Sequence, residues 1–158
     1  MPENQIKGMG KRKLLFVIPS FAGGGAERVL LNLLKRIKRD AFELTAVVFD
    51  RRNDYQEELP NDVKIICLNK RGRFDFFRLI FSLIKVIRKE RPSLINAHLP
   101  YASYIAALAN NLSGIRIPLF LTEHTTLSRD IKTERMSFLK KMFIKNLYPS
   151  ATGIIAVS

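Results

Sequence analysis

The chain has 158 residues, of which 47% are hydrophobic, and it carries 27 basic and 14 acidic side chains, a formal net charge of +13. This length predicts one domain with a full apolar core, which excludes disorder as the overall state. The single cysteine, Cys67, excludes an internal disulfide scaffold and a thiolate metal cluster, and it favours a reducing, cytoplasmic compartment. No apolar run approaches the roughly 18 residues that cross a bilayer, so we expect a soluble protein.

The excess of basic side chains gathers in patches. Residues 70–91 contain eight basic and two acidic side chains, and residues 129–145 contain six and two. A charge of this size attracts anions, so membrane phospholipid, nucleic acid and phosphorylated small molecules are all candidate partners. Nucleic acid is the least favoured, because the basic residues are interleaved with aliphatic rather than aromatic side chains and no recognition motif occurs.

The chain order of apolar patterns predicts an α/β fold. Residues 1–12 are polar and without periodicity, which indicates a flexible basic arm before a single domain of residues 13–158. Continuous apolar runs are typical of strands buried on both faces, and they occur at 14–18, 44–49, 63–68, 94–97, 119–122 and 154–157. Helical patterns separate most of these runs, at 26–39, 74–91, 101–112 and 132–148. The alternation predicts a doubly wound, mostly parallel Rossmann-like sheet of about six strands with helices on both faces. Only the connection 50–62 lacks a helical period, so we expect a loop or a short irregular helix there.

Three glycines lie between the first strand and the first helix. Gly23, Gly24 and Gly25 leave backbone N–H groups uncovered at the positive end of the helix dipole, which suits a phosphate. A flexible strand-to-helix turn without a ligand is the alternative. The pattern is not the dinucleotide fingerprint, because Arg28 stands where that motif has its third glycine, although Asp50 would suit a ribose.

Both histidines of the chain fall at the carboxyl ends of predicted strands. His98 ends the fourth strand and His124 follows the fifth, and ligands of open α/β sheets bind at that edge. A buried structural histidine is the alternative for each. The hydroxyl of Thr125 adds a possible sugar or phosphate contact, with loop capping as its alternative. Two histidines without a carboxylate or cysteine cluster predict no metal site.

Two helical segments combine apolar and basic side chains. Segment 74–91 is apolar over most of its circumference, and segment 132–148 has cationic residues beside an apolar face. Each pattern fits a surface that faces a membrane or an anion, and equally an ordinary packed or solvated helix. The candidate membrane-facing or anion-facing residues are Arg78, Lys85, Lys140, Lys141 and Lys145.

Four motifs in order carry a resemblance to a known family. Gly-Gly-Gly-Ala-Glu-Arg-Val-Leu-Leu-Asn-Leu-Leu follows the first strand, Ala-His-Leu-Pro-Tyr-Ala the fourth and Thr-Glu-His-Thr the fifth, and Ile-Ile-Ala-Val-Ser ends the chain. Together they resemble the N-terminal domain of GT-B glycosyltransferases of family 4, over nearly all of residues 13–158.

The resemblance implies a retaining transferase of two Rossmann-like domains, with the acceptor bound mainly by the first and the nucleotide-sugar by the second. It implies that Gly23–Gly25 lie near the donor diphosphate, that His124 acts at the reaction centre against the donor sugar, and that His98 lies on the acceptor side of the cleft. Thr125, beside His124, is a candidate acceptor contact by its hydroxyl. No metal or other cofactor is implied. The second domain is absent from this sequence, so we expect half of a GT-B architecture that turns over little by itself and works with a C-terminal domain in cis or in trans.

Three functions follow as expectations. The first is the acceptor-binding half of a glycosyltransferase acting on a glycan or lipid-linked acceptor at the cytoplasmic face of a membrane. The second is a non-catalytic subunit that docks on an anionic membrane surface and recruits a catalytic partner. A Rossmann oxidoreductase is less favoured, because the sequence has no Tyr-x-x-x-Lys pair for hydride-transfer chemistry.

Overall fold

The computed structural model describes residues 10–72, 75–124, 145 and 148–157. Three of the predicted site residues, Thr125, Lys140 and Lys141, lie outside the described residues, and so does nearly all of the predicted helix 132–148. The described elements, in chain order, are β1 (Arg12–Ile18), α1 (Gly25–Arg36), β2 (Phe42–Val48), β3 (Lys64–Cys67), α2 (Phe76–Glu90), β4 (Leu94–His98), α3 (Pro100–Leu112), β5 (Leu119–Glu123), a 3-10 turn (Tyr148–Ser150) and β6 (Gly153–Ala156).

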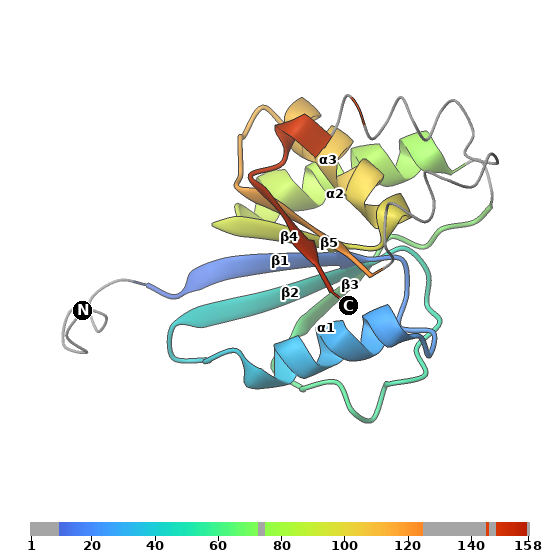
Figure 1. Ribbon diagram of the computed structural model, residues 1–158, viewed down its shortest axis with the longest axis vertical. Coiled ribbons are helices and arrows are strands. Elements are labelled where there is room, and N and C mark those ends of the chain that lie inside the picture. Colours follow the sequence, from blue (N-terminus) through green and yellow to red (C-terminus); the bar gives the residue numbers. More distant parts are fainter. Residues whose placement is uncertain (1–9, 73–74, 125–144, 146–147, 158) are drawn as a thin grey trace.

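Six parallel strands form one sheet in the order β3-β2-β1-β4-β5-β6. The predicted Rossmann-like α/β class is thereby confirmed. From β1 the chain adds β2 and then β3 on one side of β1, and it then crosses to β4 on the other side (Figure 1). This reversal is a topological switch point, and open α/β sheets bind ligands at the carboxyl edge beside such a point.

Helices cover both faces of the sheet. Helix α1 lies on one face, whereas α2 and α3 lie together on the other (Figure 1). Successive side chains of a strand point to opposite faces, so Leu15 and Val17 of β1 pack in the α2–α3 layer and Phe16 and Ile18 in the α1 layer. This double burial explains why the strands read as unbroken apolar runs rather than as alternating ones.

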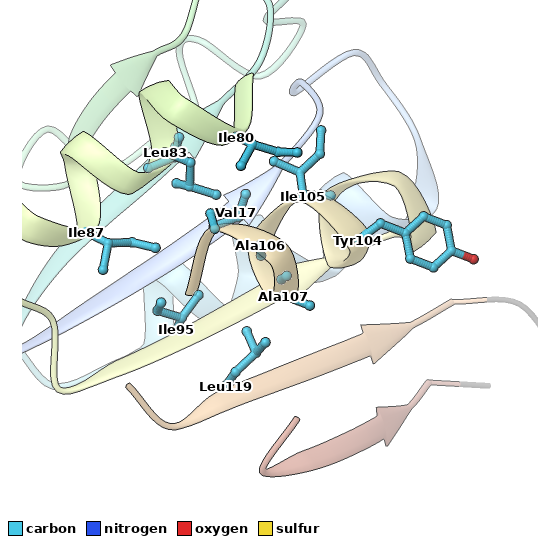
Figure 2. Packing of buried hydrophobic residues seen from close by; sticks show 14 of the residues in the cluster. Val17, Ile80, Leu83, Ile87, Ile95, Tyr104, Ile105, Ala106, Ala107 and Leu119 are labelled. Carbon is cyan, nitrogen blue, oxygen red and sulfur yellow. The ribbon is translucent and has the colours of Figure 1, made fainter. Parts of the chain in front are cut away.

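The larger core cluster lies between the sheet, α2 and α3. Figure 2 shows Ile80, Leu83 and Ile87 of α2 beside the small side chains of α3 and the strand residue Ile95. Alanines at 106 and 107 are fully buried, so α3 sits close to the sheet. Tight packing at this layer fixes where the carboxyl ends of β4 and β5 stand.

Several predicted boundaries move by one to three residues. The first helix ends at Arg36 rather than at residue 39, because Ile37 is extended and the Arg39 guanidinium donates to the Leu34 carbonyl oxygen, 2.6 Å away. Helix α2 ends where Arg91 takes a left-handed conformation, with φ 46°, directly before a proline that cannot continue the helix. The connection between β2 and β3 is a loop with turns and no helix, one of the two predicted outcomes.

Candidate functional site at the carboxyl edge of the sheet

The glycine loop leads from β1 into α1. Gly23 has a φ of 64°, a left-handed conformation that L side chains rarely adopt, and Gly24 caps α1 without any side-chain hydrogen bond. A Cβ atom added at Gly25 would meet nothing within 4 Å. The first turn of α1 therefore presents uncapped N–H groups beside open space, as the phosphate hypothesis requires.

Two carboxylates lie against the other side of this loop. A Cβ at Gly23 would come within 2.8 Å of Asp54 Oδ2, and a Cβ at Gly24 would clash with the Glu27 carboxylate. A side chain at either position would displace one of these flexible carboxylates, and the left-handed φ at Gly23 favours glycine in addition. These carboxylates repel an anion, so the open side at Gly25 is where a phosphate has room.

His98 and His124 contact each other at the ends of neighbouring strands. His98 Nδ1 lies 3.1 Å from His124 Nε2, and the two rings are 28° from coplanar with centroids 5.4 Å apart. On its other side, His98 Nε2 lies 2.7 Å from Asn96 Oδ1. The sequence predicted both histidines at this edge, and the structure adds that they form one hydrogen-bonded chain with Asn96.

Burial decides the charge of both rings. His98 is only 1% exposed, and burial, with a smaller contribution from His124, lowers its pKa to about 3. His124 is half-buried, which lowers its pKa below the ordinary 6.5, while the Glu27 carboxylate opposes that shift. Both imidazoles are therefore neutral at neutral pH, and the first turn of α1 lies within electrostatic range of His124.

Asn96 is the residue of this hydrogen-bonded chain that the sequence analysis did not single out. Its Nδ2 donates to Thr122 Oγ1 at 2.8 Å and to the Phe120 carbonyl oxygen at 3.2 Å, which ties β4 to β5. The available signal was its position: a polar residue inside an apolar strand, two places before His98 and so on the same face.

The other predicted residues lie apart from this cluster. Asp50 accepts hydrogen bonds from the backbone N–H and the guanidinium of Arg52, so its carboxylate is already engaged. The guanidinium of Arg78 is tied to the carbonyl oxygens of Leu68 and Asn69 and to Asp75. Lys85 and Lys145 are exposed.

Helix α2 presents an exposed aromatic pair that sequence reasoning did not single out. Phe77 is 71% exposed and Phe81, one turn further along the same face, is 62% exposed. Lys85 and Arg88 continue this face toward the end of the helix and are exposed too. We call Phe77, Phe81, Lys85 and Arg88 the α2 outer face.

The described residues lack two features, a metal-binding cluster and a membrane-spanning helix. Within residues 10–72, 75–124, 145 and 148–157, no group of three or more His, Cys, Asp or Glu side chains is arranged to hold a metal ion. Among the helices of that same part of the chain, none combines the length and the apolar character that crossing a bilayer takes.

The strand order and the switch point beside β1 define a Rossmann-like domain. Residues 23–158 match the family described as Glycosyltransferase Family 4, and the chain belongs to that family. The resemblance seen in the sequence motifs is thus confirmed.

A curated relative and two solved structures agree with this assignment. The chain is 26% identical over 138 residues to GalNAc-alpha-(1->4)-GalNAc-alpha-(1->3)-diNAcBac-PP-undecaprenol alpha-1,4-N-acetyl-D-galactosaminyltransferase of Campylobacter jejuni, covering 82% of this chain and 37% of that protein. HepE of Anabaena, in complex with UDP, superposes with a TM-score of 0.66 at 24% identity over 92% of this chain and 38% of its own. MurG of Acinetobacter baumannii superposes with a TM-score of 0.60 at 13% identity, over 92% and 41%. The two structural matches show the fold, and this chain spans about two fifths of each relative.

Proposed function

We propose that this domain is the N-terminal, acceptor-side half of a retaining glycosyltransferase that transfers a sugar from a nucleotide-sugar to a glycan or lipid-linked acceptor. The observation that carries the proposal is the convergence of the open glycine loop with His124 at the carboxyl edge, beside the switch point. Family membership supports the reaction class. The undecaprenol-linked acceptor named for the Campylobacter relative supports a lipid-linked acceptor, and the UDP bound to HepE supports a uridine nucleotide donor.

Each part of the site has a role in this reaction. The N–H groups at Gly25 and the positive end of α1 stabilise the negative charge that develops on the departing nucleoside diphosphate. His124 orients the transferred sugar beside that diphosphate. His98 has both ring nitrogens bonded inside the protein, so it acts by holding His124. The proposed mechanism uses neither a metal nor another cofactor.

The seat for the donor base and ribose comes from a C-terminal GT-B domain, in cis or in trans. We expect the chain alone to release little or no nucleoside diphosphate from UDP-sugars. Mixed with a C-terminal domain taken from a family member, it should transfer sugar, measured with radiolabelled donor and an undecaprenol-linked acceptor.

The His124→Ala variant tests the site within that assembly. Loss of one group that orients the transition state lowers kcat by about 10²-fold, whereas Asn111→Ala, an exposed amide outside the site, leaves kcat unchanged. Halves that associate in gel filtration yet stay inactive would contradict the proposed function. Equal rates for His124→Ala and the wild type would remove His124 from the mechanism.

A second candidate function is docking on an anionic membrane surface, with or without catalysis. The α2 outer face carries it, because exposed Phe77 and Phe81 offer apolar area while Lys85 and Arg88 offer charge beside it. Interfacial helices combine these two features when they bind anionic lipid. Such docking would place the domain at the cytoplasmic face, where a lipid-linked acceptor is reached.

Vesicle flotation tests this docking. The wild type should float with vesicles that contain phosphatidylglycerol, and binding should weaken as salt rises. The double variant Phe77→Ser/Phe81→Ser should lose most of this binding. Its matched control is Leu112→Ser, which removes an apolar side chain that is 59% exposed at the far end of α3. Equal flotation of the two variants would exclude the α2 outer face as the docking surface.

A further inference from the structure

The hydrogen bonds of Asn96 settle the orientation of its amide. Asn96 Nδ2 lies 3.2 Å from the Phe120 carbonyl oxygen, which can only accept, so this amide end must be the NH₂ group. Asn96 Oδ1 is then the atom that faces His98 Nε2 at 2.7 Å. An amide oxygen only accepts, and His98 Nε2 must therefore carry a proton.

The same logic passes through His98 to His124. His98 is buried and neutral, so with its proton on Nε2 the Nδ1 atom holds a lone pair. The 3.1 Å contact from His98 Nδ1 to His124 Nε2 is then a hydrogen bond only if His124 Nε2 donates. Neutral His124 consequently keeps its free lone pair on Nδ1.

We propose that Asn96 is a positioning residue that acts through His98 to fix His124 in the Nε2–H tautomer, so that His124 Nδ1 accepts a hydrogen bond from a hydroxyl group of the substrate. The assignment of the tautomer stands on the described hydrogen bonds together with the burial of His98. Its consequence for the substrate rests on the proposed function. A bare imidazole nitrogen attracts a hydroxyl donor and repels a phosphate oxygen, so His124 receives the sugar while the glycine loop receives the diphosphate.

Among the residues that the structure describes, three further groups lie near this chain of hydrogen bonds: Thr122, Phe16 and Glu27. Thr122 Oγ1 accepts from Asn96, and the ring of Phe16 lies 6.5 Å from the His98 ring, centroid to centroid. Glu27, from the first turn of α1, is a charged group within the described residues that acts on His124. Nothing in this set supplies His98 with a second proton at neutral pH.

Long-range ¹H–¹⁵N spectra of the ¹⁵N-labelled chain at pH 7 read the tautomer without any need for activity. The chain has two histidines, so a single His98→Gln spectrum assigns both rings. We expect the proton on Nε2 and a bare Nδ1 in His98 and in His124. A His124 ring protonated on Nδ1 alone would overturn the proposal.

Asn96→Asp then tests whether Asn96 controls the tautomer. A carboxylate at that place holds His98 as an imidazolium, whose Nδ1–H donates to His124 Nε2 and moves the His124 proton to Nδ1. The control is Asn110→Asp, which changes an amide that is likewise 5% exposed but bonds to Ile117, far from the histidines. We expect the shift of the proton in the first variant and not in the second. A folded Asn96→Asp chain with the wild-type tautomer would overturn the role of Asn96.

The reconstituted enzyme tests the consequence for the substrate. The assay uses a series of UDP-sugar analogues, each of which lacks one sugar hydroxyl. For one of them, kcat/KM of the wild type should be at least tenfold lower than for the intact UDP-sugar. This penalty should largely disappear in Asn96→Asp. Persistence of the full penalty in Asn96→Asp would overturn the hydroxyl contact. Spectra as expected in an assembly that transfers no sugar would instead overturn the proposed function and leave the tautomer assignment intact.

Discussion

At the scale of single residues, His98 couples the site to the stability of the fold. Its pKa is about 3 in the folded chain, against an ordinary 6.5, because burial disfavours the charged ring. Between these values the unfolded chain binds one proton more than the folded chain. The free energy of unfolding therefore falls as pH falls below 6.5, by about 1.4 kcal/mol per pH unit from this group.

Urea unfolding at pH 7, 6 and 5 measures this dependence. The wild type should lose stability over the interval, and His98→Gln should lose less, since its side chain does not titrate. His124 adds a smaller effect of the same sign, because its pKa is lowered too. Parallel curves for the wild type and His98→Gln would show that His98 is not buried in its neutral form.

At the scale of elements, a substitution in the strand-to-helix loop can affect ligand binding without lowering the stability of the fold. Gly25→Ala adds a methyl group in open space within the first turn of α1, so we expect unchanged or slightly higher stability, by up to about 1 kcal/mol. The same methyl group occupies the room that a diphosphate needs. Gly25→Ala should therefore weaken UDP binding and slow transfer in the reconstituted enzyme.

Gly23→Ala is the matched comparison within the same loop. Its φ of 64° and the 2.8 Å approach to Asp54 Oδ2 make the added Cβ costly, by about 1–3 kcal/mol of stability. Thermal melting and UDP titration of both variants give the answer. A Gly25→Ala enzyme with unaltered donor affinity would show that the loop is only a turn.

At the scale of the whole molecule, the net charge of +13 acts on the compact state. Like charges repel more in the folded chain than in the expanded one, and salt screens this repulsion. We expect the melting midpoint to rise between about 20 mM and about 200 mM NaCl, by about 2–4 °C for each kcal/mol regained. Sulfate at equal ionic strength should raise it further if the loop binds anions. A midpoint that falls with NaCl would mean that the ion pairs between Arg28, Lys35 and Glu58 outweigh the general repulsion.

Much of this architecture could be read from the sequence because it depends on local patterns. Unbroken apolar runs predict strands buried on both faces, and each of the six runs overlaps an observed strand. The glycine loop and both histidines were placed at the carboxyl edge for the same reason, since in a parallel sheet every strand ends on that side. The proline at α3 and the glycines before α1 mark helix starts that the chain itself encodes.

Only the tertiary structure decided which of these residues meet. The strand order places β4 beside β5, and the register sets His98 opposite Thr122, two residues before His124. From the sequence alone, Asn96 is one polar residue in an apolar strand. In the fold its amide bonds to Phe120 of the neighbouring strand and to His98, which contacts His124, 26 residues further along the chain. Helix α2 likewise has apolar residues around most of its circumference, and packing against the sheet and α3 determines that Phe77 and Phe81 stay outside. Local propensity acts along the chain, but contacts between distant segments depend on the free energy of packing the whole core, which no single segment contains.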